Sequence, residues 1–261
     1  QYAWRVLKRS PGFTFFAVLT IALGLGANAA IFSLVDGVLL KSSGYPEPQQ
    51  FVQLWEKPPG GLRNGISGAN YLDWAQQAQS FDSMAALSGG TMSYTGRVGP
   101  DGATIGGGEP RSLLTAIVSA PYFDVFGAKA AIRRTFARDE DQRGNEKVTV
   151  LSHRIFTSLF GADASLVGQQ IMLNGEPYSV IGVLPGSSEF DRQPNDLWVP
   201  LAFPPNPARD YHYLRAVARM KRGVGLDQAQ AEMSAIAGRI AQLYPDIKKD
   251  WGATVDSYVD R

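Results

Sequence analysis

The hydrophobic positions of the chain form one long run near the N-terminus and many short runs after it. From Ser10 to Val35 there are 26 consecutive residues without a charge. A helix of about 20 apolar residues crosses the roughly 30 Å hydrocarbon core of a bilayer. The run therefore predicts a transmembrane helix over residues 13–37, preceded by a short flank at residues 1–12.

The charges beside this run predict its orientation. Arg5, Lys8 and Arg9 precede it with no acidic residue among them, and Asp36 follows it directly. Basic residues concentrate on the cytoplasmic side of membrane helices. We therefore expect a cytoplasmic N-terminus and extracytoplasmic residues after about position 40.

Small residues form a stripe within the predicted membrane helix. Ala22, Gly26 and Ala30 recur every four residues and so share one face. Small side chains let membrane helices approach each other closely. The stripe predicts packing against other transmembrane helices, which residues 38–261 do not contain.

Three other interpretations of the run are open. A cleaved signal peptide also combines a basic start with an apolar middle, and a buried helix of a soluble protein is also apolar. The third is a dinucleotide site, because Gly24, Gly26 and Ala29 fit the relaxed fingerprint G-x-G-x-x-G/A and Glu56 ends the next predicted strand. Against it, Glu56 lies 30 residues after Gly26, whereas such acids lie about 20 residues on.

The residues after the run alternate between short apolar segments and turn-forming segments, which is typical of a folded α+β domain. Strands are predicted at 51–56, 84–96, 103–119, 148–151, 170–173, 176–183, 196–201, 213–220 and 253–259. Helices are predicted at 70–79, 154–160 and 226–244, with a short aromatic turn or helix at 122–126.

Two local signals are clearest. The helix at 226–244 has an apolar stripe at spacings of three and four that predicts contact with a sheet. Its members are Leu226, Ala229, Met233, Ile236, Ile240 and Leu243. Between two strands, Asn174-Gly175 is a residue pair that tolerates the positive φ angles of a type I′ hairpin.

The order of these elements predicts a two-lobed domain. Residues 51–118 and 213–259 each read as a β-α-β unit, and two such units pack into a ferredoxin-like sheet with helices on one face. We therefore expect one lobe built from residues 45–119 and 206–261. Residues 120–205 form a strand-rich lobe inserted between its halves.

Composition excludes several kinds of chemistry. The chain has no cysteine, which removes disulfides, thiolate metal sites and cysteine nucleophiles. The net charge is +1, and Arg133-Arg134 and Lys248-Lys249 are isolated basic pairs, too small for a nucleic-acid footprint. We expect no nucleic-acid partner.

No catalytic, cofactor or metal site is predicted. His153 and His212 have no metal-ligand spacing to another donor, so both are read as ordinary surface or packed residues. The triplet Asp139-Glu140-Asp141 lacks the spacing of a calcium loop and is read as a solvated loop. Gly106-Gly107-Gly108 lacks the Lys-Ser/Thr of a phosphate loop and is read as a bulge or bend.

The chain resembles the MacB/FtsX-type ABC transporter permeases, in particular the ADOP-like ones, over essentially its whole length. The segments that carry the resemblance are Leu7–Thr14, Leu19–Asn28, Ala30–Ser33, Val118–Gly127, Val150–Ser152, Phe160-Gly161, Val167-Gly168, Leu173–Val183 and Asp196–Leu201. A departure occurs in Ala131–Arg134, where relatives usually carry a glycine before the arginine, and it concerns a local turn.

The resemblance implies a bacterial inner-membrane permease subunit that is not itself an enzyme. Its extracytoplasmic part would be a MacB-like periplasmic core domain, with a porter-like lobe and the inserted lobe. The implied partners are a separate cytoplasmic ATPase, further transmembrane helices of the same permease and a possible second copy. An open alternative is a membrane-anchored extracytoplasmic binding or signalling module without transport.

Overall fold

The computed structural model describes residues 47–99, 101–106, 108–186 and 193–258, with single positions 12, 22, 26, 188 and 190. It separates two compact units, Gln1–Gly44 and Tyr45–Arg261. The predicted transmembrane helix at 13–37 lies outside the described residues, apart from Ala22 and Gly26, which are both helical. Among the described residues, no helix is both long enough and apolar enough to cross a membrane.

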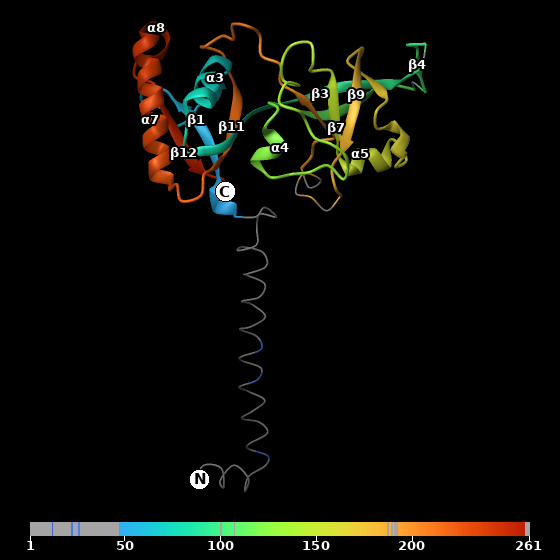
Figure 1. Ribbon diagram of the computed structural model, residues 1–261, viewed down its shortest axis with the longest axis horizontal. Coiled ribbons are helices and arrows are strands. Elements are labelled where there is room, and N and C mark those ends of the chain that lie inside the picture. The colour runs from blue at the N-terminus through green and yellow to red at the C-terminus, as the bar shows by residue number, and fades with distance from the viewer. Residues whose placement is uncertain are drawn as a thin grey trace. The chain divides into compact units, whose positions relative to one another are not determined.

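The second unit is built on one sheet, to which twelve strands of the described chain belong (Figure 1). The strands are β1 (Phe51–Lys57), β2 (Ile66–Ser67), β3 (Phe81–Val98), β4 (Thr104–Ile105), β5 (Arg111–Val118), β6 (Ile132–Arg133), β7 (Val148–Leu151), β8 (Gln170–Leu173), β9 (Glu176–Val183), β10 (Leu197–Pro200), β11 (His212–Met220) and β12 (Gly252–Ser257). The main path runs β12-β1-β11-β3-β5-β10-β7-β9-β6.

Short helices accompany the sheet. They are α3 (Gly68–Gln77), α4 (Tyr122–Val125), α5 (His153–Ser158), α7 (Leu226–Leu243) and α8 (Pro245–Lys248), with the 3-10 helices η2 (Pro48–Gln50) and η3 (Ala164–Leu166). Helix α3 begins where the Ser67 side chain accepts a hydrogen bond from the Asn70 amide. Such a cap satisfies an amide that has no partner inside the helix.

Among the first four strands of the path, β12, β1, β11 and β3, each neighbouring pair is antiparallel, and α3 and α7 cover one face. Four members of the predicted apolar stripe on α7 are buried against this face: Ala229, Met233, Ile236 and Ile240. The prediction is wrong at both ends of the helix. Leu226 and Leu243 are 40% and 72% exposed, because the helix extends beyond the core at these positions.

Strand β3 is 18 residues long and passes from this first core into a second one. Met84 and Ala86 belong to the first core, whereas Met92 belongs to a second core formed with β8, β9 and α5. A third cluster, rich in aromatic side chains from α4 and including Trp198 of β10, lies against the strands between them.

The predicted hairpin is confirmed. Leu173 pairs with Glu176, and the turn residues Asn174 and Gly175 have φ values of 51° and 78°. The Asn174 side chain also accepts a hydrogen bond of 2.7 Å from the Ser93 amide, so the turn is fixed to β3. The predicted strand at 103–119 is instead two strands, β4 and β5, which residues 106–110 separate.

The segment that departs from the resembled family has an unusual backbone. Arg133 has a φ of 57°, in the left-handed region that favours glycine. The neighbouring strand β9 also lies close to this segment. A Cβ on Gly182 would lie 2.1 Å from the Arg134 carbonyl oxygen. The guanidinium of Arg133 in turn lies beside Gly168.

We expect Arg133→Gly to stabilise the domain. Glycine has no Cβ to strain at positive φ, and the gain should raise the free energy of unfolding by about 0.5–1 kcal/mol. Urea unfolding of the two chains measures this difference. Arg143→Gly, at an exposed loop position without a positive φ, is the control and should not stabilise. A less stable Arg133→Gly variant would mean that the arginine's contacts outweigh its backbone strain.

Candidate functional site

Residues 47 and 258, the first and last described residues of the domain, lie at the same end of the strand pair β1–β12. The Tyr258 amide donates a hydrogen bond of 2.9 Å to the Phe51 carbonyl oxygen, and Val52 pairs with Ser257. Arg219 of β11 forms an ion pair of 3.5 Å with Glu47 just before η2. Residues 47 and 258 are therefore held at one end of β1, by contacts with β1 and β11.

A buried ion pair lies at the opposite end of these strands. Glu56 and Lys248 are each 1% exposed, and the Lys248 ammonium donates to the Glu56 carboxylate. The Lys248 Nζ atom also lies 2.8 Å from His212 Nε2 and 4.1 Å from the centre of the Trp251 ring. The other Glu56 oxygen accepts from the Ser67 amide at 2.9 Å.

These contacts join four segments that are distant in sequence: the end of β1, the start of α3, the start of β11, and the turn from α8 to β12. Burial lowers the pKa of Lys248, and the hydrogen bond to Glu56 acts in the opposite direction. The His212 ring stacks on Trp251 with centres 4.8 Å apart. A charge removed from water in this way is tolerated only while its partner is present.

This pair bears on two interpretations of the sequence. Lys248 is one residue of the isolated basic pair Lys248-Lys249, and it is buried whereas Lys249 is exposed. Glu56 cannot serve as a ribose ligand of a dinucleotide site, because its carboxylate is occupied and β1 has antiparallel neighbours on both sides. Alternation along β1 gives the missed signal, since Val52, Leu54 and Glu56 share the buried face.

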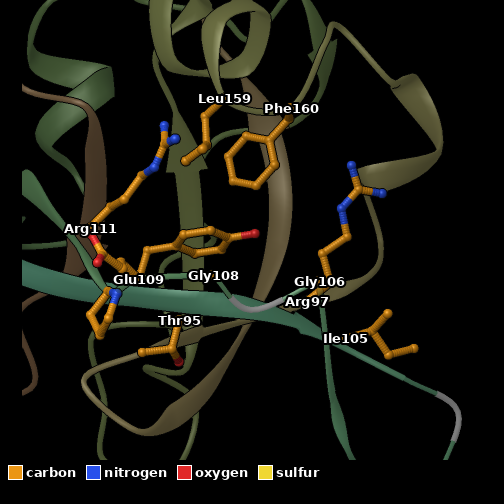
Figure 2. A pocket seen from close by; sticks show the side chains of 11 residues that line it. Thr95, Arg97, Ile105, Gly106, Gly108, Glu109, Arg111, Leu159 and Phe160 are labelled. Carbon is orange, nitrogen blue, oxygen red and sulfur yellow. The ribbon is translucent and has the colours of Figure 1, made fainter.

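A cavity of about 740 Å³ lies at the far end of β3, beside the second core. Figure 2 shows Arg97 and Arg111 on either side of the Phe160 ring, with Leu159 close to Phe160. Its lining consists of Tyr94, Thr95, Arg97, Ile105, Gly106, Gly108, Glu109, Pro110, Arg111, Leu159 and Phe160. Gly106 and Gly108, from the predicted bend, form part of its edge.

A second cavity, of about 610 Å³, lies where α3 and β3 approach α4, and the acidic triplet borders it. The triplet is not a solvated loop: Glu140 is buried and forms a 2.7 Å ion pair with Arg134. Asp141 accepts from the Ala120 amide, and burial raises its pKa. The same cavity contains the ring of Tyr71, whose pKa burial raises to about 12.

The remaining predicted residues form no common site. His153 begins α5 at an exposed position, whereas His212 belongs to the buried network. Among the described residues, no group of three His, Cys, Asp or Glu side chains is arranged to hold a metal ion. In the predicted membrane stripe Ala22 and Gly26 are helical and exposed, and Ala30 lies outside the described residues.

We expect Lys248→Met to destabilise the domain strongly, because it leaves the Glu56 carboxylate buried without its counter-charge. The expected loss is about 3–5 kcal/mol in the free energy of unfolding, measured by urea unfolding with tryptophan fluorescence. The double variant Glu56→Leu/Lys248→Met removes both charges and should recover most of this loss. The control is Lys249→Met at the exposed neighbouring residue, which should change the free energy of unfolding by about 0.5 kcal/mol or less. A double variant as unstable as Lys248→Met would show that the pair is not the cause.

Comparison with known proteins identifies relatives over most of the chain. The family model described as MacB-like periplasmic core domain matches residues 14–236. The probable syringafactin export ATP-binding/permease protein SyfD of Pseudomonas syringae is 35% identical over 91 residues, covering 34% of this chain and 14% of that protein. The macrolide export ATP-binding/permease protein MacB of Shigella dysenteriae is 32% identical over 122 residues, covering 44% of this chain and 18% of that protein.

Solved structures show the same fold at low identity. A domain of a putative permease from Porphyromonas gingivalis has a TM-score of 0.59 at 13% identity, over 82% of this chain and 93% of that one. The periplasmic region of MacB from Actinobacillus actinomycetemcomitans has a TM-score of 0.54 at 17% identity, over 80% and 90%.

The matched parts are less than a fifth of the curated relatives' length, so these proteins contain much that this chain does not. The α+β fold and the family match agree with the resemblance seen in the sequence. The chain belongs to the MacB-like periplasmic core domain family, the extracytoplasmic domain of ABC transporter permeases.

Proposed function

We propose that this chain supplies the first membrane helix and the extracytoplasmic domain of an ABC-type permease subunit. In this function, motion driven by ATP hydrolysis in the cytoplasm reaches the domain through the membrane and performs efflux or mechanotransmission. The names of the curated relatives, which are export ATP-binding/permease proteins, support a role in export. The uncharged run from Ser10 to Val35 supports the membrane helix.

The single observation that carries the proposal is where the chain connections lie. Both are held at one end of β1 and β12, and β3 continues from the same set of strands into the second core. A displacement of the connections therefore has a continuous mechanical route to the other lobe. The order β12-β1-β11-β3, with helices on one face, supports a ferredoxin-like, porter-type lobe formed by residues 45–119 and 206–261. Residues 120–205 are then the inserted lobe.

The proposed partners are a separate ATPase in the cytoplasm, further transmembrane helices of the same permease, and a second copy of the subunit. Ala22, Gly26 and Ala30 are the positions at which we expect a neighbouring membrane helix to pack. In this proposed function the chain contributes no catalytic residue, because the extracytoplasmic domain acts by changing its position.

Two spin labels test the proposal in the full-length permease, purified from its native membrane with the ATPase that accompanies it. The chain has no cysteine, so Ala164→Cys and Gln242→Cys place labels at exposed positions of the two lobes. We expect the distance distribution to shift between the nucleotide-free and ATP-bound states. Identical distributions, or a permease that co-purifies with no ATPase, would contradict the coupling and favour an anchored module without transport.

The middle of β3 supplies a sharper variant. Gly89 and Gly90 are exposed, and a Cβ at either position would meet no atom within 4 Å. The double variant Gly89→Val/Gly90→Val should therefore be tolerated and should stabilise the strand by about 0.5–1 kcal/mol for each glycine replaced. If bending at this point transmits motion, it should also reduce the ATP-dependent shift in label distance. The control is Gly238→Ala on α7, which has the same free space but lies outside β3. An unchanged shift in the stiffened variant would remove β3 bending from the mechanism.

A further inference from the structure

The cavity at the far end of β3 combines positive charge with an apolar wall. Arg111, at the start of β5, has no ion-pair partner within the described part of the chain. Arg97 forms a 3.0 Å ion pair with Asp163, which also accepts from the Ser165 hydroxyl. The cavity lining has two guanidinium groups and one carboxylate, that of Glu109.

The positive charges of both arginines interact electrostatically with the hydroxyl of Tyr94. Burial raises the pKa of Tyr94, and the positive charges of Arg97 and Arg111 act in the opposite direction. The hydroxyl is therefore protonated at neutral pH and can donate a hydrogen bond. Each guanidinium and the phenol can donate hydrogen bonds of the kind that a carboxylate accepts, and Figure 2 shows the two guanidinium groups on opposite sides of the Phe160 ring.

The remaining wall is apolar. The rings of Tyr94 and Phe160 meet edge to face with centres 5.5 Å apart, and the Arg97 guanidinium lies 5.9 Å from the centre of Phe160. Leu159 and Ile105 extend the wall, and Ile105 is exposed. A cavity of this size, with a lining that is partly apolar and partly polar, can hold a small organic molecule.

We propose that this cavity binds an organic carboxylate with a flat apolar body, the carboxylate at Arg111 and the body against Phe160 and Leu159, with the positive charge of Arg97 on the far side of the ring. An inorganic anion would leave the apolar wall in water, and a neutral molecule would leave Arg111 without an acceptor. The site lies in the lobe that carries neither chain connection. The inference therefore stands apart from the proposed transport function.

Calorimetric titration of the full chain, held in lipid nanodiscs, with 2-naphthoate tests the site. We expect one saturable equivalent with a Kd of roughly 0.1–1 mM, which is usual for a ligand of this size. The neutral isostere 2-naphthamide should bind at least about tenfold more weakly, because it makes no charge-assisted hydrogen bond. Empty nanodiscs measure the partition of either compound into lipid.

Two variants move the affinity in opposite directions, which damage to the fold cannot do. Arg111→Gln should weaken 2-naphthoate at least about tenfold, since it removes the arginine without an ion-pair partner. Asp163→Asn keeps an oxygen to cap η3 but releases Arg97 from its counter-charge, so it should tighten binding about two- to fivefold. Arg222→Gln, at an exposed arginine of the other lobe, is the matched control and should leave the Kd unchanged.

Three results would each overturn the proposal. They are the absence of saturable binding, equal affinity for the naphthoate and its amide, and a Kd that Arg111→Gln leaves unchanged. Weaker binding by Asp163→Asn would equally reject a favourable contribution of the Arg97 charge. Because no ATPase or further membrane helix enters this measurement, it can fail while the proposed transport function stands, and the reverse also holds.

Discussion

All three hydrophobic clusters among the described residues of the domain include residues of strand β3. In its first half β3 is paired with β11 as far as Leu87, and in its second half it is paired with β8 from Tyr94 onward. Between these pairings, at 88–92, β3 has a bonded neighbouring strand within the described chain, β5, on one side only. Exposed Gly89 and Gly90 lie in this segment. Met84 before this segment and Met92 at its end pack into different cores, whereas the aromatic cluster joins β1 and β11 to β7, β9 and β10.

The ion pair of Glu56 and Lys248 gives the first lobe a rigidity that its apolar core alone would not. Hydrophobic contacts hold α7 against the sheet but are non-directional, whereas a buried charge pair fixes the position of each partner. It joins the ends of β1, α8 and β11 at the end of the sheet opposite the chain connections. Strands β1, β11 and β12 are therefore linked at both ends, by this ion pair at one end and by the contacts of residues 47 and 258 at the other.

The elements that could be predicted from the sequence are those whose formation depends on residues close together in the chain. The Asn174-Gly175 hairpin followed from the φ preferences of two residues, and α7 from the spacing of its apolar residues. Partners brought together by tertiary packing were not predictable in the same way. Lys248 and Glu56 are 192 residues apart, and nothing near Lys248 distinguishes it from exposed Lys249. The arginines of the cavity come from two strands, and an aromatic ring from a third segment completes the site, so no motif in the sequence could mark it.

Residues 88–92 of β3 and the position of the cavity together restrict how a ligand could influence the rest of the domain. Arg97 and Tyr94 belong to β3 itself, a few residues beyond Gly89 and Gly90. Arg111 begins β5, the strand that pairs with residues 88–92 of β3. A molecule bound in the cavity would therefore contact the ends of both strands. Coupling between distant sites needs an element with two arrangements that both sites favour differently. The β3–β5 pair lines the cavity, and the aromatic cluster joins β1, β3 and β11 to β7, β9 and β10, so the two ends of the domain are in contact through both.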